Sequence, residues 1–296
     1  MKSICTVCLA GGLALMPVAA QQPTPDESPQ PANESELEAE IRASSEEHMR
    51  LELGVNDITT PSIASVLRDL GVFRPVPIAL IQSNNRDASY ANRMQTALHF
   101  GSLVADGFML TIAERPDDIQ DIGRALIRQS RALNAGDTLT KRSKSLFELS
   151  ANGDWAGMRE ELIRTQGDVE QSMLDLHDEE MAHMVSLGGW LRGFQLAARA
   201  TTENHTPERA AILARTEIID YYLDRLNTLH PRLKQTEFAQ TLIAKIEELR
   251  GLAEASAGSP SREQVAVMSS TADEAVAIAL GPVDAEGNRL PGSSAP

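Results

Sequence analysis

The sequence predicts an all-α protein, a bundle of about eight helices. Apolar residues recur every three or four positions through several long segments, which is the spacing of a helix face turned toward a core. No stretch alternates with a period of two for long enough to predict a strand. Brief polar breaks separate the segments, which favours antiparallel neighbours. We expect a long central helix (155–200) packed on a Gly-rich apolar helix (88–113).

The N-terminus has the pattern of a secretion signal. Lys2 supplies a positive charge, and the apolar run from Leu9 to Val18 is too short to span a bilayer. Small residues, Ala19 and Ala20, precede Gln21 at a suitable cleavage position. We therefore expect residues 1–20 to be a signal peptide. The mature protein would be periplasmic or extracellular, with no membrane span after cleavage.

Cysteine content and charge restrict the remaining possibilities. Both cysteines, Cys5 and Cys8, lie in the signal peptide, so packing alone must hold the mature chain together in an oxidising compartment. The 296-residue chain has a formal net charge of −15, which becomes −16 when the leader and its single Lys2 are removed. Such an acidic surface favours solubility and disfavours nucleic acid as a partner.

The composition divides the chain into four parts. Residues 21–35 are rich in proline, glutamine and serine and predict a disordered linker. A helical domain is expected over 36–280, and the polar stretch 201–206 marks where it would divide if it has two parts. Residues 281–296 are rich in glycine, proline and serine and predict a disordered tail.

The boundaries of the first helices in this domain are predicted from capping residues and from helix-breaking glycine and proline. One amphipathic helix is expected over 36–53, ended by Gly54, and a short one from Pro61 to about Leu70. Residues 72–87 contain two prolines and should be irregular. The helix at 88–113 is apolar on nearly every side from Leu103 to Ile112, as expected of a helix surrounded by others.

The later helices are predicted in the same way. A helix ending near Leu133 opens with several acids, which we interpret as first-turn residues favoured by the helix dipole. A helix over 138–150 follows. The long helix over 155–200 has an N-cap candidate at Asp154 and no internal proline. Three more helices are expected, from Pro207 to about Leu229, around 238–249 and around 260–279.

Glycines inside the two central helices predict a close contact between them. Gly188, Gly189 and Gly193 together cost about 2–3 kcal/mol relative to alanine in a helix interior. The other helix carries Gly101 and Gly107. A close approach of two backbones, where a side chain would obstruct, is the usual compensation.

Polar residues interrupt the apolar faces of these helices. Glu180 and His183 form a Glu-x-x-His pair one turn apart, and Asp106 lies inside the most apolar run of the other helix. The candidate binding cluster at the crossing is His99, Asp106, His177, Glu180, His183 and Arg192. We interpret five of these residues first as a buried network whose members satisfy one another and fix helix register, namely His99, Asp106, Glu180, His183 and Arg192.

A metal site is the sharper alternative. Di-iron carboxylate bundles use two Glu-x-x-His motifs with two further glutamates, but the chain contains no second such motif. We therefore expect no metal and no cofactor. The sequence also lacks the nucleophile elbow, the mature cysteine nucleophile, the phosphate loop and the His-Glu-x-x-His motif of known enzyme classes.

Two function classes remain open. The first is an exported helical binding or scaffold module without catalytic activity, with an unknown protein or small molecule as its partner. The second is a small-site protein, either a metal binder or a hydrolase-like enzyme, that uses the polar cluster at the helix crossing.

Overall fold

The computed structural model describes residues 70–281, 283 and 284, and every regular element from Leu70 to Leu280 is a helix. The predicted all-α bundle is confirmed. All described residues belong to a single compact unit. The signal peptide, the linker, the helices expected before Leu70 and the tail beyond Asp284 lie outside the described residues.

The helices vary widely in length. The longer ones are α4 (Arg93–Ile112), α5 (Pro116–Ala132), α6 (Gly136–Ala151), α7 (Trp155–Asp175), α8 (Glu179–Glu203), α10 (Thr216–Asn227), α12 (Glu237–Ala255) and α13 (Arg262–Leu280). The shorter ones are η1 (Leu70–Val72), α3 (Ile78–Gln82), α9 (Pro207–Leu213) and α11 (Pro231–Lys234).

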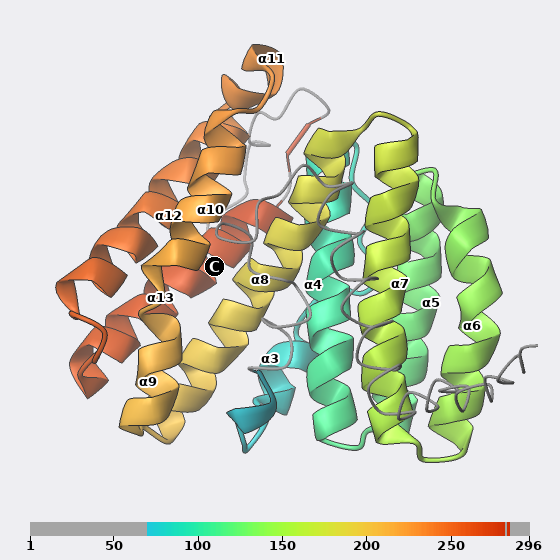
Figure 1. Ribbon diagram of the computed structural model, residues 1–296, viewed down its shortest axis with the longest axis horizontal. Coiled ribbons are helices and arrows are strands. Elements are labelled where there is room, and N and C mark those ends of the chain that lie inside the picture. Colours follow the sequence, from blue (N-terminus) through green and yellow to red (C-terminus); the bar gives the residue numbers. More distant parts are fainter. Residues whose placement is uncertain (1–69, 282, 285–296) are drawn as a thin grey trace, which may run out of the picture. The chain divides into compact units, whose positions relative to one another are not determined.

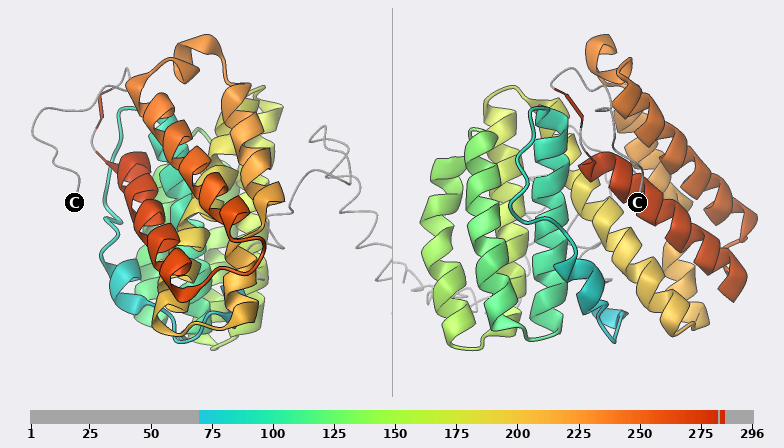
Figure 2. Two further views of the ribbon diagram at one scale, coloured as in Figure 1. Left: turned by 90° about the vertical axis from the view of Figure 1, so that its left-hand side faces the viewer. Right: turned by 180° about the vertical axis from the view of Figure 1, so that it is seen from behind.

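Helix α4 lies at the centre of the described part of the chain. Helices α4, α5, α6 and α7 stand side by side, and α8 crosses α4 toward α9, α10, α12 and α13 (Figure 1). Figure 2 shows the same grouping from the side and from behind. Helix α4 packs on α5, α7, α8 and α13, and its most extensive contact is with α8.

Burial explains the composition of α4. Every residue from Met94 to Ile112 is buried, which confirms that this helix is surrounded by others. It begins at Arg93 rather than at residue 88, because the side chain of Asn92 caps it by accepting from the backbone N–H of Met94 at 2.9 Å. Among the described helices, none has the combination of length and hydropathy needed to cross a membrane.

The single helix predicted over 155–200 is wrong, because the chain forms two helices there. Helix α7 ends at Asp175, and His177 adopts a left-handed conformation with φ 57°. The N–H of Asp178 then donates to the carbonyl of Met173, and the N–H of His177 to that of Leu174, both at 2.8 Å. This pattern is a Schellman motif, which satisfies the last carbonyls of α7 and reverses the chain into α8.

The same motif makes all four reversals between α4 and α8. The left-handed residues of the other three turns are Glu114, Asn134 and Gly153, with φ of 55°, 64° and 66°. In each turn the next N–H donates to the carbonyl five residues earlier, as from Arg115 to Leu110. Only two of the four turns place glycine or asparagine, the residues that ordinarily mark such a turn, at the left-handed position.

Glycines allow the backbones of α4 and α8 to touch. A Cβ atom added to Gly101 would lie 2.0 Å from the carbonyl oxygen of Val185, and one added to Gly188 would lie 2.1 Å from that of Leu98. Both obstacles are backbone atoms of the opposite helix, which cannot rotate away. The close contact predicted from the glycines is therefore present at Gly101 and Gly188.

We expect Gly188→Ala to destabilise the protein by at least roughly 1–3 kcal/mol, because the added methyl group must separate α8 from α4. This loss would appear even though alanine favours a helix by about 1 kcal/mol over glycine. Denaturant unfolding of the purified protein measures the effect.

Gly251→Ala is the matched control, since no atom lies within 4 Å of a Cβ placed there in α12. It should leave stability unchanged or raise it by up to about 1 kcal/mol. Equal stability of the two variants would contradict the close contact.

Candidate functional site

A buried ion pair lies beside the helix crossing. The Asp106 side chain of α4 is fully buried, and Arg192 of α8 is 3% exposed. The Nε of Arg192 donates to Oδ1 of Asp106 at 2.7 Å, and Nη2 approaches Oδ2 at 3.4 Å. Each residue lies within two turns of the glycines at the crossing. The close approach of the two backbones therefore brings these charges together.

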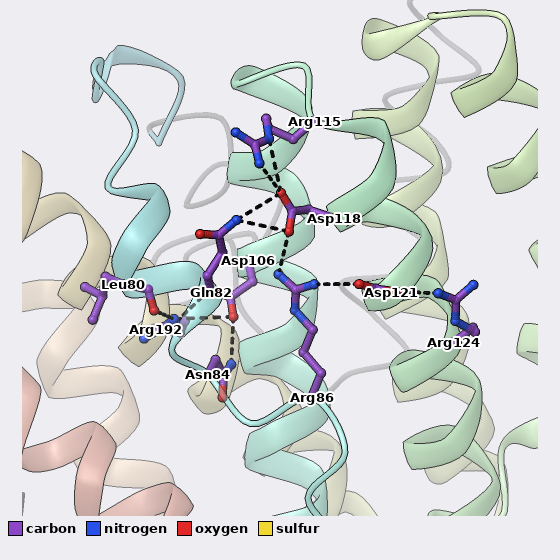
Figure 3. Close-up of polar contacts among 10 residues, drawn as sticks. All are labelled: Leu80, Gln82, Asn84, Arg86, Asp106, Arg115, Asp118, Asp121, Arg124 and Arg192. Atoms are coloured by element: carbon purple, nitrogen blue, oxygen red, sulfur yellow. Dashed lines mark hydrogen bonds and ion pairs between the residues drawn. The ribbon is translucent and has the colours of Figure 1, made fainter.

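Other protein groups complete the hydrogen bonding of this pair. The Nη2 of Arg192 also donates to the carbonyl of Leu80 in α3 at 2.9 Å, and the Nδ2 of Asn84 donates to Oδ2 of Asp106 at 2.7 Å (Figure 3). Asn84 further donates to the hydroxyl of Ser102 at 3.3 Å. The segment after α3 is thereby fastened across α4.

The polar network continues from Arg192 toward α13. Its Nη1 donates to Oε1 of Gln195, and Nε2 of Gln195 donates to Oδ1 of Asp273 at 2.8 Å. Asp273 also pairs with Arg199 of α8. One continuous network therefore connects α3, α4, α8 and α13.

Burial and pairing act in opposite directions on Asp106. Burial raises the pKa of its carboxyl, whereas the Arg192 guanidinium and the Asn84 amide favour the ionised form. A carboxylate in such a position needs its partners, because an unpaired buried charge costs far more than a paired one.

A second network surrounds Asp118 on α5. Arg86 and Arg115 both pair with its carboxylate, at 3.2 and 3.0 Å, and Gln82 approaches both oxygens (Figure 3). Burial raises the pKa of Asp118, but the hydrogen bonds from Arg86 and Gln82 outweigh it and lower the pKa. Asp118 lies in the first turn of α5, as predicted from the sequence. Through its ion pair with Arg86 it also holds the segment that follows α3.

His99 is buried under this segment but does not join the ion pair. Its ring lies edge-on to that of Tyr90, with centroids 5.3 Å apart, and neither ring nitrogen makes a well-formed hydrogen bond. Burial, together with the charges of Arg192 and Arg128, lowers its pKa to about 4, while the Asn85 carbonyl acts weakly the other way. The imidazole is therefore neutral in the folded protein near neutral pH.

The remaining candidates lie at the other end of α8. Glu180 precedes Arg192 by twelve positions, or about 18 Å along a helix. Its carboxylate accepts from the backbone N–H of His230, just before α11. His183 is half-buried, and burial and Arg225 lower its pKa. His177 is exposed in the α7–α8 turn. The structure thus brings Asp106 and Arg192 together and keeps Glu180, His183 and His177 away from them.

Sequence reasoning missed a further cluster between α7, α8 and α10. The Nε2 of Gln166 donates to Glu170 at 2.9 Å, while Oε1 of Gln166 is buried without a partner. Burial raises the pKa of Glu170 to about 7, and the bond from Gln166 opposes this. The hydroxyls of Ser186 and Tyr222 share a hydrogen bond of 3.0 Å nearby. The only sequence signal was the position of Glu170 beside the apolar stripe of α7.

No protein-family model, curated protein or solved structure matches the chain. Within the described residues, no group of three or more histidine, cysteine, aspartate or glutamate side chains is arranged to hold a metal ion.

His99 should make the protein less stable in mild acid. Its pKa is lower in the folded chain than the ordinary value of 6.5, so the unfolded chain binds the extra proton first as the pH falls. Stability from this group is complete above about pH 6.5 and falls by about 3 kcal/mol as the pH approaches 4. We expect His99→Leu to reduce this dependence in unfolding experiments between pH 7 and 4.

The control for this measurement is His177→Asn, which removes an imidazole that is exposed in the turn. It should leave in place the loss of stability in acid that His99 causes. An identical slope for wild type and His99→Leu would show that the imidazole of His99 is not sealed from water.

Glu170 should change the pH dependence of folding stability in the direction opposite to His99. Because its pKa is raised in the fold, its contribution is complete below about pH 4.5 and is lost as the pH rises through about 7. We expect Glu170→Gln to raise the free energy of unfolding at pH 8 by roughly 1–3 kcal/mol, with little change at pH 4.5.

Glu247→Gln, which changes an exposed carboxyl on α12, should not reproduce this stabilisation. A Glu170→Gln variant that is no more stable than wild type at pH 8 would mean that the carboxylate is solvated or paired.

Proposed function

We propose that the protein is an exported helical scaffold or binding module whose buried ionic cluster is structural rather than catalytic. One observation carries the proposal. Asp106 and Arg192 form an ion pair with each other, and their remaining hydrogen bonds go to neighbouring protein groups. Asp106 is fully buried and accepts from Arg192 and Asn84. A catalytic acid or base must reach a substrate, at least through a water molecule.

The hydrogen-bond partners of Arg192 lie on several helices, so the cluster connects these helices to one another. The donors of Arg192 reach α3 through Leu80, α4 through Asp106 and α13 through Gln195 and Asp273. One guanidinium therefore holds three elements against α8. Such a network specifies one arrangement of helices among several that an apolar core would tolerate.

The rival function, a metal binder or hydrolase-like enzyme, needs several of the candidate residues to converge. Glu180 instead caps a backbone N–H near α11, and His177 is exposed in a turn. Their separation from Asp106 supports the structural role. The export part of the proposal rests on the sequence, namely the signal peptide pattern at 1–20 and the proline-rich linker that follows it.

A double-mutant cycle on Asp106→Asn and Arg192→Met tests the proposal. Removing one partner of a buried pair leaves the other uncompensated, so each single variant should lose about 3–5 kcal/mol of stability. The double variant should lose clearly less than the sum, because it leaves no unpaired charge. The cycle is measured by chemical denaturation.

Glu254→Gln provides the control, because it removes one partner of the exposed Arg250–Glu254 pair and should cost less than about 1 kcal/mol. Metal analysis of the purified wild-type protein is the second readout. Single variants as stable as wild type, or stoichiometric zinc or iron, would favour the rival function.

A further inference from the structure

An irregular segment covers part of α4. Residues 83–92 (the strap) connect α3 to α4 and run along α4 next to α5 (Figures 2 and 3). Three buried polar residues of α4 meet the strap, and they have the three- and four-residue spacing of a single helix face. Asn84 donates to Ser102 and to Asp106, and the ring of Tyr90 lies against that of His99. The strap therefore covers a polar stripe of the central helix.

Polar contacts hold the strap in place. Nη2 of Arg128 on α5 donates to the carbonyl of Arg86 at 2.9 Å, and Nε2 of Gln129 donates to that of Ala88 at 2.7 Å. The even-numbered residues from 84 to 90 are half-buried, and the odd-numbered residues from 83 to 91 are exposed. A segment with so little buried apolar surface opens more easily than the helices beneath it.

The ring of His99 is sealed under the strap. His99 is fully buried, and the edge of the Tyr90 ring closes over it with centroids 5.3 Å apart. Neither ring nitrogen makes a well-formed hydrogen bond within the described part of the chain, and the Asn85 carbonyl favours the charged ring only weakly. A proton added to this ring is therefore poorly solvated while the strap is closed.

The charges around the ring also oppose a proton. Besides burial, Arg192 of α8 and Arg128 of α5 lower the pKa of His99. The carboxylate of Asp106, two turns along α4, is bonded to Arg192. Burial raises the pKa of Tyr90 to about 12, and its hydroxyl donates to a carbonyl at the end of α13, so it stays neutral. The strap itself thus supplies the ring with no negative charge from Tyr90.

We propose that the strap opens in mild acid while the helices stay folded, and that protonation of His99 is the trigger. Opening moves Tyr90 off the ring, and the imidazolium then reaches water. The pKa of His99 is about 4 when it is sealed and 6.5 when it is solvated. The closed form is therefore fully favoured above about pH 6.5, and opening becomes easier as the pH falls toward 4. This device goes beyond the proposed function, because a scaffold does not need a cover that opens.

Thiol labelling of a cysteine placed under the strap tests this opening. Residues 21–296 contain no cysteine, so Ser102→Cys gives the mature protein a single reporter beneath Asn84. Its reaction rate with a dipyridyl disulfide, divided by that of a model peptide thiol at the same pH, follows the open fraction. This ratio should rise about 30- to 100-fold from pH 7 to pH 4.5. His99→Leu in the same background should abolish the rise.

Ser269→Cys is the matched control. Ser269 is 5% exposed on α13, eleven residues before Leu280, whose carbonyl meets the strap. Its relative labelling should change far less over the same pH range, because the helices stay folded. Equal acceleration at both reporters would mean that the whole fold opens, which would contradict a local device.

Gln129→Leu tests the strap without changing any charge. It removes the hydrogen bond to the carbonyl of Ala88. At pH 7 it should raise the labelling of Ser102→Cys about three- to tenfold, the value of one hydrogen bond. Labelling that stays at the rate of the parent would show that this bond does not hold the strap.

Three further results would overturn the proposal. Labelling of Ser102→Cys that is equal at pH 7 and pH 4.5 would show that the strap does not respond to acid. A rise that persists in His99→Leu would assign the trigger to another group, such as Asp106. Should His99→Leu fail to fold, nuclear magnetic resonance of the wild-type ring decides the matter: a ring of His99 that titrates at 6.5 is not sealed.

Discussion

Where α4 crosses α8, the two backbones are so close that neither Gly101 nor Gly188 has room for a side chain. The positions of the charged groups follow from this contact. Asp106 lies five residues beyond Gly101, and Arg192 lies one turn beyond Gly188. Both side chains are buried and in direct contact, with Nε of Arg192 2.7 Å from Oδ1 of Asp106, so the guanidinium and the carboxylate satisfy each other. The ion pair in turn resists sliding of one helix along the other.

The same pair explains how an irregular segment is held on a helical core. The carbonyl of Leu80 accepts from Arg192, and Asn84 donates to Asp106, so the segment after α3 is bound to the charges buried beneath it. Arg86 extends this attachment outward to Asp118 on α5. These contacts support our proposal that polar groups that look like a functional site in the sequence have a structural use.

Much of the fold and part of the site could be predicted from the sequence. The glycine positions predicted the close crossing. The polar residues among apolar ones predicted a buried network of His99, Asp106, Glu180, His183 and Arg192, of which the structure pairs Asp106 with Arg192. The break at 176–178 could not be predicted, because the left-handed position is occupied by His177 rather than glycine or asparagine. Glu180 and His183 share α8 with Arg192, but they precede it by twelve and nine positions, so they lie about 18 and 14 Å from it along the helix and away from the ion pair. Glu170 was missed because a single acid beside an apolar stripe ordinarily faces solvent.

The most direct test of the crossing is a proton–proton contact between its glycines. The protein would be produced with protonated glycine in an otherwise deuterated background, and cross-peaks between glycine protons would be recorded by nuclear Overhauser spectroscopy. A Cβ on Gly101 would lie 2.5 Å from the backbone nitrogen of Gly189, so an α-proton of Gly101 should show a strong cross-peak to the amide proton of Gly189. If both residues are assigned and no such cross-peak is present, α4 and α8 do not touch at these glycines.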